Sequence, residues 1–371
     1  MKLKIYTENY KQECLNNIPL APMILSFFSN KENSSIKNYH ALTFKHYWET
    51  CQSFFTISSL ADSQFAVFPY DWFWVRGATW LYPINSLVSK EVKKFGFEYY
   101  QKMKKNNRTV LFFFSGDRSH EKLPFENAIV FREGLYQSQQ KASDFTLPAF
   151  SEDLVEYYLS GSMIPRSKSV KPTVGFCGLA KKSNPKNLVK LGIYHSLMLA
   201  TRGTPDVSPY KGEELRIKLL NQFGNHSDID TNFIIRDESV FLANPSYESK
   251  SKRRKEYVEN MIQSDYILCC RGSGNYSYRI YETLCMGRIP IFVNTDCSLP
   301  YDFLIDWKNY CVWLEETEIE QLPSKLLDFH NSLSPQDFVD LQYKCRELWL
   351  KWLSPEGFFS NFYHHLPQFN I

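Results

Sequence analysis

The sequence predicts an α/β protein built from two domains, each a parallel sheet covered by helices. Short apolar runs alternate with helical patterns along the chain, which is typical of parallel sheets. The length of 371 residues is long for a single core. The polar, proline-broken stretch Ser160–Pro172 is followed at once by a new strand pattern. We therefore place the linker there and predict a ligand cleft between the two domains.

The elements follow from short apolar runs and from apolar residues at helical spacing. Predicted strands are Lys2–Tyr6, Phe65–Phe68, Thr109–Phe114, Ala128–Phe131, Thr173–Cys177, Asn232–Arg236, Tyr266–Cys270, Ile289–Val293 and Tyr310–Leu314. Predicted helices are Asn85–Lys104, Asn187–Thr201, Lys211–Phe223, Glu248–Ile262 and Tyr276–Met286. We predict domains at 1–165 and 166–345 and a helical tail at 346–371. The apolar pattern of Gln336–Leu353 allows the last helix to cross back to the first domain or to pack on the second.

Composition excludes several classes of protein. A hydrophobic content of 43% with 16% aromatic residues is typical of a folded globular chain. The net charge of +3 gives no reason to expect a partner nucleic acid. The basic run Lys250–Lys255 is interpreted as a solvated helix face, with contact to acidic lipid or an anionic glycan as the alternative.

The N-terminal residues alternate like a strand, and no secretory signal or membrane span is evident in the pattern. The nine cysteines have no paired or zinc-site spacing, so we expect buried free thiols and a cytoplasmic protein. No metal site is predicted. Asp228 and Asp230 form an Asp-x-Asp triplet, but they follow a turn-like run instead of ending a strand, so we interpret them as loop residues.

The segment Tyr266–Asp302 is the most informative about function. It predicts a strand, a loop opened by Arg271 and Gly272, a helix with Ser277 as N-cap, and a second strand. This order places a cation, free backbone N–H groups and a helix N-terminus at the carboxyl end of a strand. Such a corner favours a diphosphate.

Arg279 and Glu282 lie three residues apart on one face of the predicted helix. Glu282 is suited to accept hydrogen bonds from two ribose hydroxyls, and Arg271 and Arg279 to contact phosphate oxygens. Together they would stabilise a leaving diphosphate without a metal ion. The alternative is that Arg279 and Glu282 form an ordinary surface ion pair.

The amino-acid sequence of this segment resembles the C-terminal signature of the exostosin-like glycosyltransferases. The shared features are Gly272, the string Ser-Tyr-Arg-Ile-Tyr-Glu at 277–282, Gly-Arg-Ile-Pro-Ile at 287–291 and Leu299-Pro300. Weaker similarities lie at 174–178 and at 66–70. The C-terminal similarity covers some 50 residues.

The resemblance implies a GT-B architecture, in which two Rossmann-like domains face each other across a cleft. It implies inverting transfer from a nucleotide-diphosphate sugar, with an acceptor-binding first domain and a donor-binding second domain. By position, Glu282 would bind the ribose, and Arg271, Ser277, Tyr278 and Arg279 the diphosphate. No cofactor is expected beyond the nucleotide sugar. The expected partners are that donor and an oligosaccharide or lipid-linked glycan acceptor of surface polysaccharide biosynthesis, with the enzyme cytoplasmic or peripheral at the inner face of the membrane.

Inverting transfer needs a general base, which we expect from the first domain. Three candidates follow strands there: Asp71, Asp117 and His120. The alternatives are that Asp71 is a turn residue, that Asp117 is a cap or an ion-pair partner of Arg118, and that His120 is an ordinary loop histidine. Glu133 is a lesser candidate.

Other residues have lower priority. Lys181, Lys182 and Arg236 follow strands of the second domain and are candidates for phosphate contact. Trp72, Trp74 and Trp80 are candidates for a glycan platform or for core packing. Two other functions stay open, a fucosyltransferase-like enzyme and a non-catalytic glycan-binding partner of a glycosyltransferase.

Overall fold

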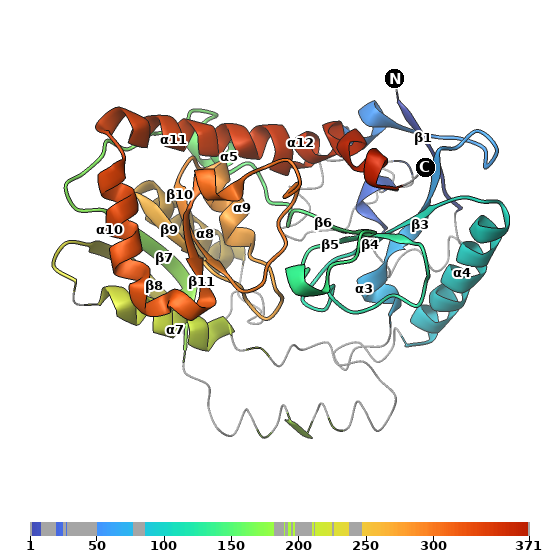
Figure 1. Ribbon diagram of the computed structural model, residues 1–371, viewed down its shortest axis with the longest axis horizontal. Helices are drawn as coiled ribbons and strands as arrows, with labels where there is room; N and C mark the ends of the chain where they lie inside the picture. The colour runs from blue at the N-terminus through green and yellow to red at the C-terminus, as the bar shows by residue number, and fades with distance from the viewer. Residues whose placement is uncertain are drawn as a thin grey trace.

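A computed structural model of the chain describes residues 2–8, 20–24, 50–76, 86–181, 212–224, 226–236 and 247–369, with 27, 189, 192, 193, 196 and 210 as isolated residues. Over these residues the chain forms two parallel sheets, each flanked by helices (Figure 1). The predicted α/β class with two Rossmann-like units is therefore confirmed. We call the parts around the two sheets the first and the second domain.

The first sheet has the strand order β2-β1-β3-β4-β5-β6, and every neighbouring pair is parallel. Its strands are β1 (Leu3–Tyr6), β2 (Phe55–Ile57), β3 (Phe65–Asp71), β4 (Val110–Phe114), β5 (Ile129–Arg132) and β6 (Asp144–Thr146). β2 and β6 were not predicted, because strands of three residues are too short to show a period.

β3 continues through Pro69 to Asp71, three residues beyond its predicted end. The register with β4 shifts between Val67 and Asp71. Pro69, which has no N–H group to donate, lies at this irregularity, so the strand can include it. All seven residues of β3 and all five of β4 are buried. Burial on both faces is the usual environment of central parallel strands.

The second sheet has the order β11-β10-β9-β7-β8 and is also parallel. Its strands are β7 (Thr173–Leu179), β8 (Asp230–Arg236), β9 (Tyr266–Cys269), β10 (Ile289–Asn294) and β11 (Val312–Glu315). All five strands were predicted, with ends that differ by one or two residues. In both sheets the first strand along the chain lies between the second and the third, so the strand order reverses there.

Helices cover both sheets (Figure 1). The α-helices are α3 (Trp72–Val75), α4 (Ser86–Lys105), α5 (Leu154–Leu159), α7 (Gly212–Phe223), α8 (Tyr247–Ile262), α9 (Tyr278–Cys285), α10 (Leu322–Ser332), α11 (Pro335–Leu348) and α12 (Pro355–Ser360). Shorter helical turns are η2 (Pro22–Ile24), η4 (Gln137–Gln139), η5 (Trp307–Tyr310), η6 (Glu316–Gln321), η7 (Trp349–Leu353) and η8 (Phe362–Phe369). The predicted helix at 187–201 lies largely outside the described residues.

The C-terminal segment crosses from the second domain to the first. α11 packs against α9 and β10, and the chain then passes through the π-helical turn η7 into α12 and η8. The ring of Phe362 lies 5.5 Å from that of Phe55, 6.1 Å from Phe65 and 5.2 Å from Phe131. The last residues therefore complete the core of the first domain, which settles the two alternatives left by the sequence (Figure 1).

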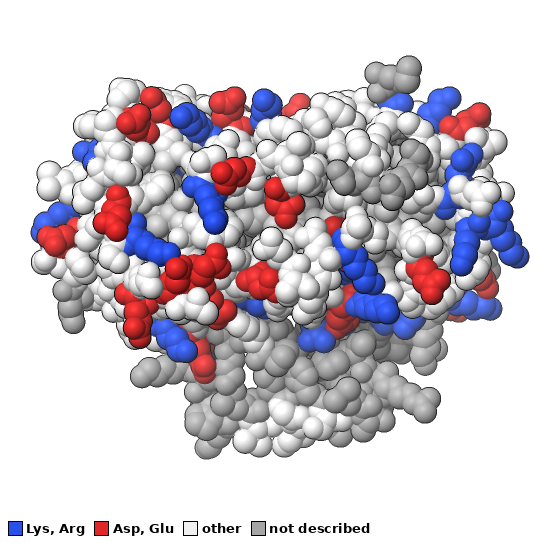
Figure 2. Space-filling model, in the orientation of Figure 1, with Lys and Arg blue, Asp and Glu red and all other residues white. Residues whose placement is uncertain are grey.

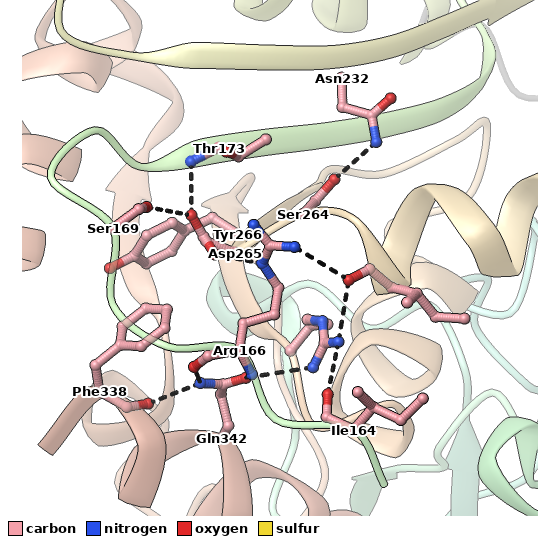
Figure 3. Close-up of polar contacts among 12 residues, drawn as sticks. Ile164, Arg166, Ser169, Thr173, Asn232, Ser264, Asp265, Tyr266, Phe338 and Gln342 are labelled. Carbon is pink, nitrogen blue, oxygen red and sulfur yellow. Dashed lines mark hydrogen bonds and ion pairs between the residues drawn. The ribbon is translucent and has the colours of Figure 1, made fainter. Parts of the chain in front are cut away.

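The predicted linker is held to the second domain, as Figure 3 shows. Arg166 donates from Nε to Asp265 Oδ1 at 2.6 Å, and the Asp265 carboxylate also accepts from the Thr173 N–H at 2.9 Å. The side chain of Gln342 bonds the backbone N–H and carbonyl of Arg166. These contacts lie at the amino ends of β7 and β9, so they fix the linker at the sheet edge opposite the carboxyl ends.

A polar seam joins the carboxyl-end loops of the two domains. Its backbone bonds run from Ser298 N to Leu135 O (3.1 Å) and from Gln137 N to Asp296 O (2.9 Å). Ser138 also donates from its N–H to the Asp296 carboxylate at 3.0 Å. The seam brings the ends of the two sheets together and encloses the space between them.

On the face of the molecule drawn in Figure 2, acidic and basic side chains are interspersed over both domains. This distribution agrees with the small net charge of +3. Long-range attraction of one sign of charge is therefore not what this face provides.

Candidate functional site

The topology of the second sheet identifies a ligand position before any side chain is considered. β7 lies between β8 and β9. The chain therefore adds β8 on one side of β7 and β9 on the other, and the strand order reverses at β7. Ligands of open α/β sheets bind outside the carboxyl ends of the strands at such a reversal. The loops after β7 and β9 are therefore the expected binding elements.

Arg279, on the first turn of α9, spans this reversal. Its Nη2 donates to the carbonyl of Cys177 at 2.8 Å and its Nη1 lies 3.5 Å from the carbonyl of Leu268, so one guanidinium connects the ends of β7 and β9. The guanidinium also lies over the ring of Phe176, 4.3 Å from its centroid. Gly178 leaves room for it, since a Cβ there would lie 2.7 Å from Arg279 Nη2.

Arg216, on α7, makes a second bridge across the same two strands. It donates from Nη1 to Leu179 O at 3.0 Å and from Nη2 to Arg271 O at 3.3 Å. Its Nε is buried and has no hydrogen-bond partner among the described residues. Sequence reasoning missed Arg216, because it lies more than fifty residues before the motif and on a helix whose pattern explains it as surface.

Arg271 provides the third cation and shapes its own loop. Its side chain is buried and donates to the carbonyls of Gly274 (3.2 Å) and Ser273 (3.0 Å). The guanidinium lies 3.7 Å from the ring centroid of Tyr210 and 5.4 Å from that of Tyr136 in the first domain. Three guanidinium groups thus gather within one loop cluster, which is suited to a polyanionic group.

The start of α9 agrees with the prediction. Ser277 is the N-cap residue, with extended backbone angles, and its side chain makes no capping hydrogen bond. Tyr278 begins the helix. The N-terminal N–H groups of α9 are therefore not bonded by the residue that usually caps them, and the helix dipole adds positive potential at this end.

Glu282 lies on the buried face of α9 and is paired within the second domain. Its Oε1 accepts from Arg254 Nη1 at 2.8 Å and its Oε2 accepts from the Tyr257 hydroxyl. Arg254 also forms an ion pair with Glu152 at 2.9 Å. Glu282 thus pairs with Arg254 and not with Arg279, so the alternative of an ordinary surface ion pair between Arg279 and Glu282 is not what the structure shows. Each carboxylate oxygen still has a second lone pair, so the arrangement orients Glu282 and leaves it able to accept from hydroxyls.

The two remaining second-domain candidates lie at the carboxyl ends of β7 and β8. Lys181 is exposed just after β7. Arg236 ends β8 and donates to Glu256 on α8 at 2.8 Å. Lys182, like Trp80 of the first domain, lies outside the described residues.

In the first domain, Asp71 ends β3 and holds two neighbouring loops. Its carboxylate accepts from the N–H of Phe73 at 2.9 Å, which caps α3, and from the N–H of Ser115 after β4. Burial raises the pKa of Asp71 to about 6, against these hydrogen bonds, which lower it. The alternative predicted for Asp71 was a turn residue, and its carboxylate acts as the N-cap of α3.

Asp117 and His120 lie on the loop after β4 and face the second domain. Asp117 accepts from the Gly274 N–H at 3.1 Å. Burial raises the pKa of Asp117, while the bond from Gly274 and the nearby Arg271 lower it. The ring of His120 packs edge-on against Tyr136, and its Nδ1 is buried without a partner among the described residues. Burial, with Arg118 nearby, lowers the pKa of His120.

Glu133, the lesser candidate of the sequence, is the most strongly perturbed carboxyl of this group. It follows β5, is buried, and accepts from the Gly116 N–H at 2.7 Å. Burial raises its pKa to about 8, and the neighbouring charges of Asp71 and Asp117 add to the shift. A carboxyl with a displaced pKa in a cavity wall is a candidate for proton transfer.

A cavity between the two domains is lined by candidate residues of both domains. The first domain contributes Glu133, and the second contributes Arg271, Ser277 and the carboxyl end of β10. The remaining lining residues are Tyr276, Ile280, Tyr281, Phe292, Val293, Thr295, Cys297, Ser298 and Leu299. Arg271, the start of α9 and Glu133 therefore line one internal space of about 10 Å³, which has room for about one water molecule.

The other sequence expectations have mixed outcomes. Asp228 lies in a turn, as predicted, whereas Asp230 is the first residue of β8, so the acidic triplet leads into a strand instead of ending one. The eight cysteines that the structure describes are buried free thiols, also as predicted. Trp72 packs in the first-domain core, against Phe68, Phe112 and Phe125.

The described parts of the chain contain no group of three or more His, Cys, Asp or Glu side chains arranged to hold a metal ion. None of the helices that the structure describes is long and apolar enough to cross a membrane.

Comparison with known proteins identifies the family of this segment. Residues 195–328 match the Exostosin GT47 domain, so the resemblance to the exostosin-like glycosyltransferases is confirmed. The match includes Arg216, Arg271, Arg279 and Glu282.

Individual relatives share only part of the chain. It is 29% identical over 86 residues to the probable glucuronosyltransferase GUT1 of Oryza sativa subsp. japonica, which is 23% of this chain and 21% of that protein. It is 28% identical over 102 residues to Exostosin-1 of Drosophila melanogaster, which is 28% of this chain and 13% of that protein. The chain thus spans 21% of the length of the first of these relatives and 13% of the second. A solved glycosyltransferase from Rickettsia africae ESF-5 aligns over 100% of this chain and 99% of its own at 11% identity, with a TM-score of 0.35.

Proposed function

We propose that this exostosin-like chain is an inverting glycosyltransferase that moves a sugar from a nucleotide-diphosphate donor to an oligosaccharide or lipid-linked glycan. The observation that carries the proposal is the cluster of Arg216, Arg271 and Arg279 at the strand reversal of the second sheet. These residues lie inside the segment that matches the Exostosin GT47 domain. A loop with three guanidinium groups and an open helix start is suited to a diphosphate.

The donor is proposed to bind with its diphosphate on Arg271, Arg279 and the N–H groups at 272–278. Ser277 and Tyr278 then line the diphosphate at the start of α9. Glu282 accepts from the ribose hydroxyls, in an orientation set by Arg254 and Tyr257. Lys181 and Arg236 are proposed as outer basic residues of the donor side.

The chemical step is a single displacement at the anomeric carbon. An acceptor hydroxyl oxygen attacks this carbon as its bond to the diphosphate oxygen breaks, and the electron pair leaves with the diphosphate. The hydroxyl proton passes to a base. The arginine cluster stabilises the negative charge on the leaving group, so we propose that no metal ion is required.

The base is proposed to be one of the first-domain groups at the ends of β4 and β5. Asp117 and His120 face the glycine-rich loop, and Glu133 lines the cavity together with Arg271. Asp71 is the least accessible candidate, because both of its neighbouring loops donate hydrogen bonds to it.

For the cell, we propose a cytoplasmic enzyme of surface polysaccharide biosynthesis, peripheral at the inner face of the membrane when its acceptor is lipid-linked. The fucosyltransferase-like enzyme and the non-catalytic glycan-binding partner remain the alternatives.

Donor hydrolysis and transfer by the purified chain test the proposal. A thermal-shift screen with UDP, GDP, CMP and ADP sugars selects the donor, because a ligand raises apparent stability by mass action. Glu282→Ala is expected to abolish donor binding while the fold persists, since Arg254 keeps its pair with Glu152. Glu259→Ala, on the exposed side of α8, is the matched control.

Three results would overturn parts of the proposal. Full donor binding and turnover by Glu282→Ala would remove this residue from the site. Activity that disappears in EDTA and returns with Mn²⁺ would contradict the metal-independent step. Binding of glycans without hydrolysis or transfer of any donor would favour the non-catalytic alternative.

A further inference from the structure

A carboxylate of the first domain occupies the glycine-rich loop of the second. Asp117 Oδ1 accepts the Gly274 N–H at 3.1 Å, across 157 positions of sequence. The approach is so close that only glycine fits at 274, since a Cβ there would lie 2.8 Å from both the Cα and the Oδ1 of Asp117. The loop is therefore shaped to receive this anion.

The charges around this contact are those of an anion site. Arg271 and Arg216 both favour the charged form of Asp117 and lower its pKa, whereas burial raises it. Tyr276 and Gly274 give the carboxylate its hydrogen bonds. Asp117 supplies the negative charge opposite Arg271 and Arg216, so no carboxylate of the second domain is needed to balance these two positive charges.

The Gly274 N–H and Arg271 are also among the groups proposed above to hold the diphosphate. One N–H cannot serve a carboxylate oxygen and a phosphate oxygen at full strength at the same time. Two like charges within a few ångströms also repel each other. Donor and Asp117 are therefore competitors for one position.

We propose that Asp117 is an internal substitute for the donor phosphate, which holds the Gly272–Ser277 loop in the empty enzyme and is displaced when the donor binds. This inference rests on the proposed function. Displacement releases the carboxylate into the cleft beside His120, where it becomes free to contact the acceptor. Donor binding then precedes acceptor activation, and the enzyme follows an ordered mechanism.

The test is the sign of the change in anion affinity. Calorimetric titration with inorganic pyrophosphate is compared for the full-length wild type and Asp117→Asn, which keeps the side-chain shape and an acceptor oxygen but removes the charge. Because the competitor is weakened, Asp117→Asn is expected to bind pyrophosphate tenfold or more tightly. Asp228→Asn, in a surface turn, is the matched control and should equal the wild type.

Asp117→Ala is measured in parallel, so that the comparison survives if the first variant does not fold. Equal or weaker binding by the folded variants, including no measurable binding to either protein, would overturn the inference. A purely structural role for Asp117 also predicts weaker binding, because a disordered loop binds less well.

The outcome is separable from that of the proposed function. Wild-type turnover of a nucleotide sugar without a gain of pyrophosphate affinity in the variants would refute the substitute role alone. A gain of affinity in a chain that neither hydrolyses nor transfers any donor would refute the glycosyltransferase proposal alone.

Discussion

The two domains bring different ionisable groups to their junction, and they hold these groups by different means. The second domain presents arginines whose donors are fixed by backbone carbonyls at the ends of β7 and β9. The first presents the carboxyl groups of Asp71, Asp117 and Glu133 at the ends of three neighbouring strands. The carbonyls orient the cations without neutralising them, whereas the charges of Asp71 and Asp117 raise the pKa of Glu133. Under the proposed function, the second domain binds the donor and the first domain takes up the proton.

The largest effect is expected when the first domain loses the C-terminal segment that completes its core. Phe362→Ala removes a fully buried ring that contacts Phe55, Phe65 and Phe131, and should cost about 3–5 kcal/mol of stability. Chemical denaturation measures this cost. Tyr363→Ala, at a side chain 52% exposed, is the control and should change stability little. An equally small effect of Phe362→Ala would show that the first domain does not depend on η8.

The second domain is tested by removing one cation. Arg279→Ala takes away the guanidinium that connects β7 to β9, and is expected to lower kcat/KM about 10²–10³-fold, the usual cost of one donor to a developing anion. Lys344→Ala, an exposed cation of α11, is the matched control. Steady-state kinetics with the selected donor measure both. An equal loss of kcat/KM in both variants, or a loss in Lys344→Ala alone, would contradict the role of the arginine cluster.

The smallest effect concerns the buried carboxyl group of the first domain. The folded pKa of Glu133, about 8, lies above the ordinary value of 4.5, so the folded state binds an extra proton between these pH values. Stability contributed by this proton is present below pH 4.5 and is lost as the pH rises toward 8. Glu133→Gln should therefore be more stable than the wild type by about 1–3 kcal/mol at pH 8, and the advantage should vanish near pH 5.

Thermal unfolding at a series of pH values measures this difference, with the exposed Glu320→Gln as control. A stability difference that does not change between pH 5 and pH 8 would mean that Glu133 is ionised throughout. In that case the first domain would present an ordinary negative surface, and the contrast with the second domain would be one of charge alone.

Much of the donor side was predictable because its residues are close in sequence. The strand, loop and helix from Tyr266 to Cys285 carry Arg271, Ser277 and Arg279 within one supersecondary unit. Local patterns fix the geometry of such a unit. The partners of Glu282 were not predictable, because Arg254 and Tyr257 reach it from α8 only after both helices pack on the same sheet.

The sequence by itself determined the α/β class, the strands of both sheets except β2 and β6, and the glycine-rich corner. Each of these depends on the period of apolar residues or on neighbours along the chain. Only the tertiary structure decided that Arg216 contacts the loop after β9, that Asp117 bonds Gly274 and that the last described residues complete the first core. These contacts join residues 55 to more than 200 positions apart. Their formation depends on how α7 packs beside that loop, how the two domains approach each other and where the C-terminal segment crosses, which no local pattern records.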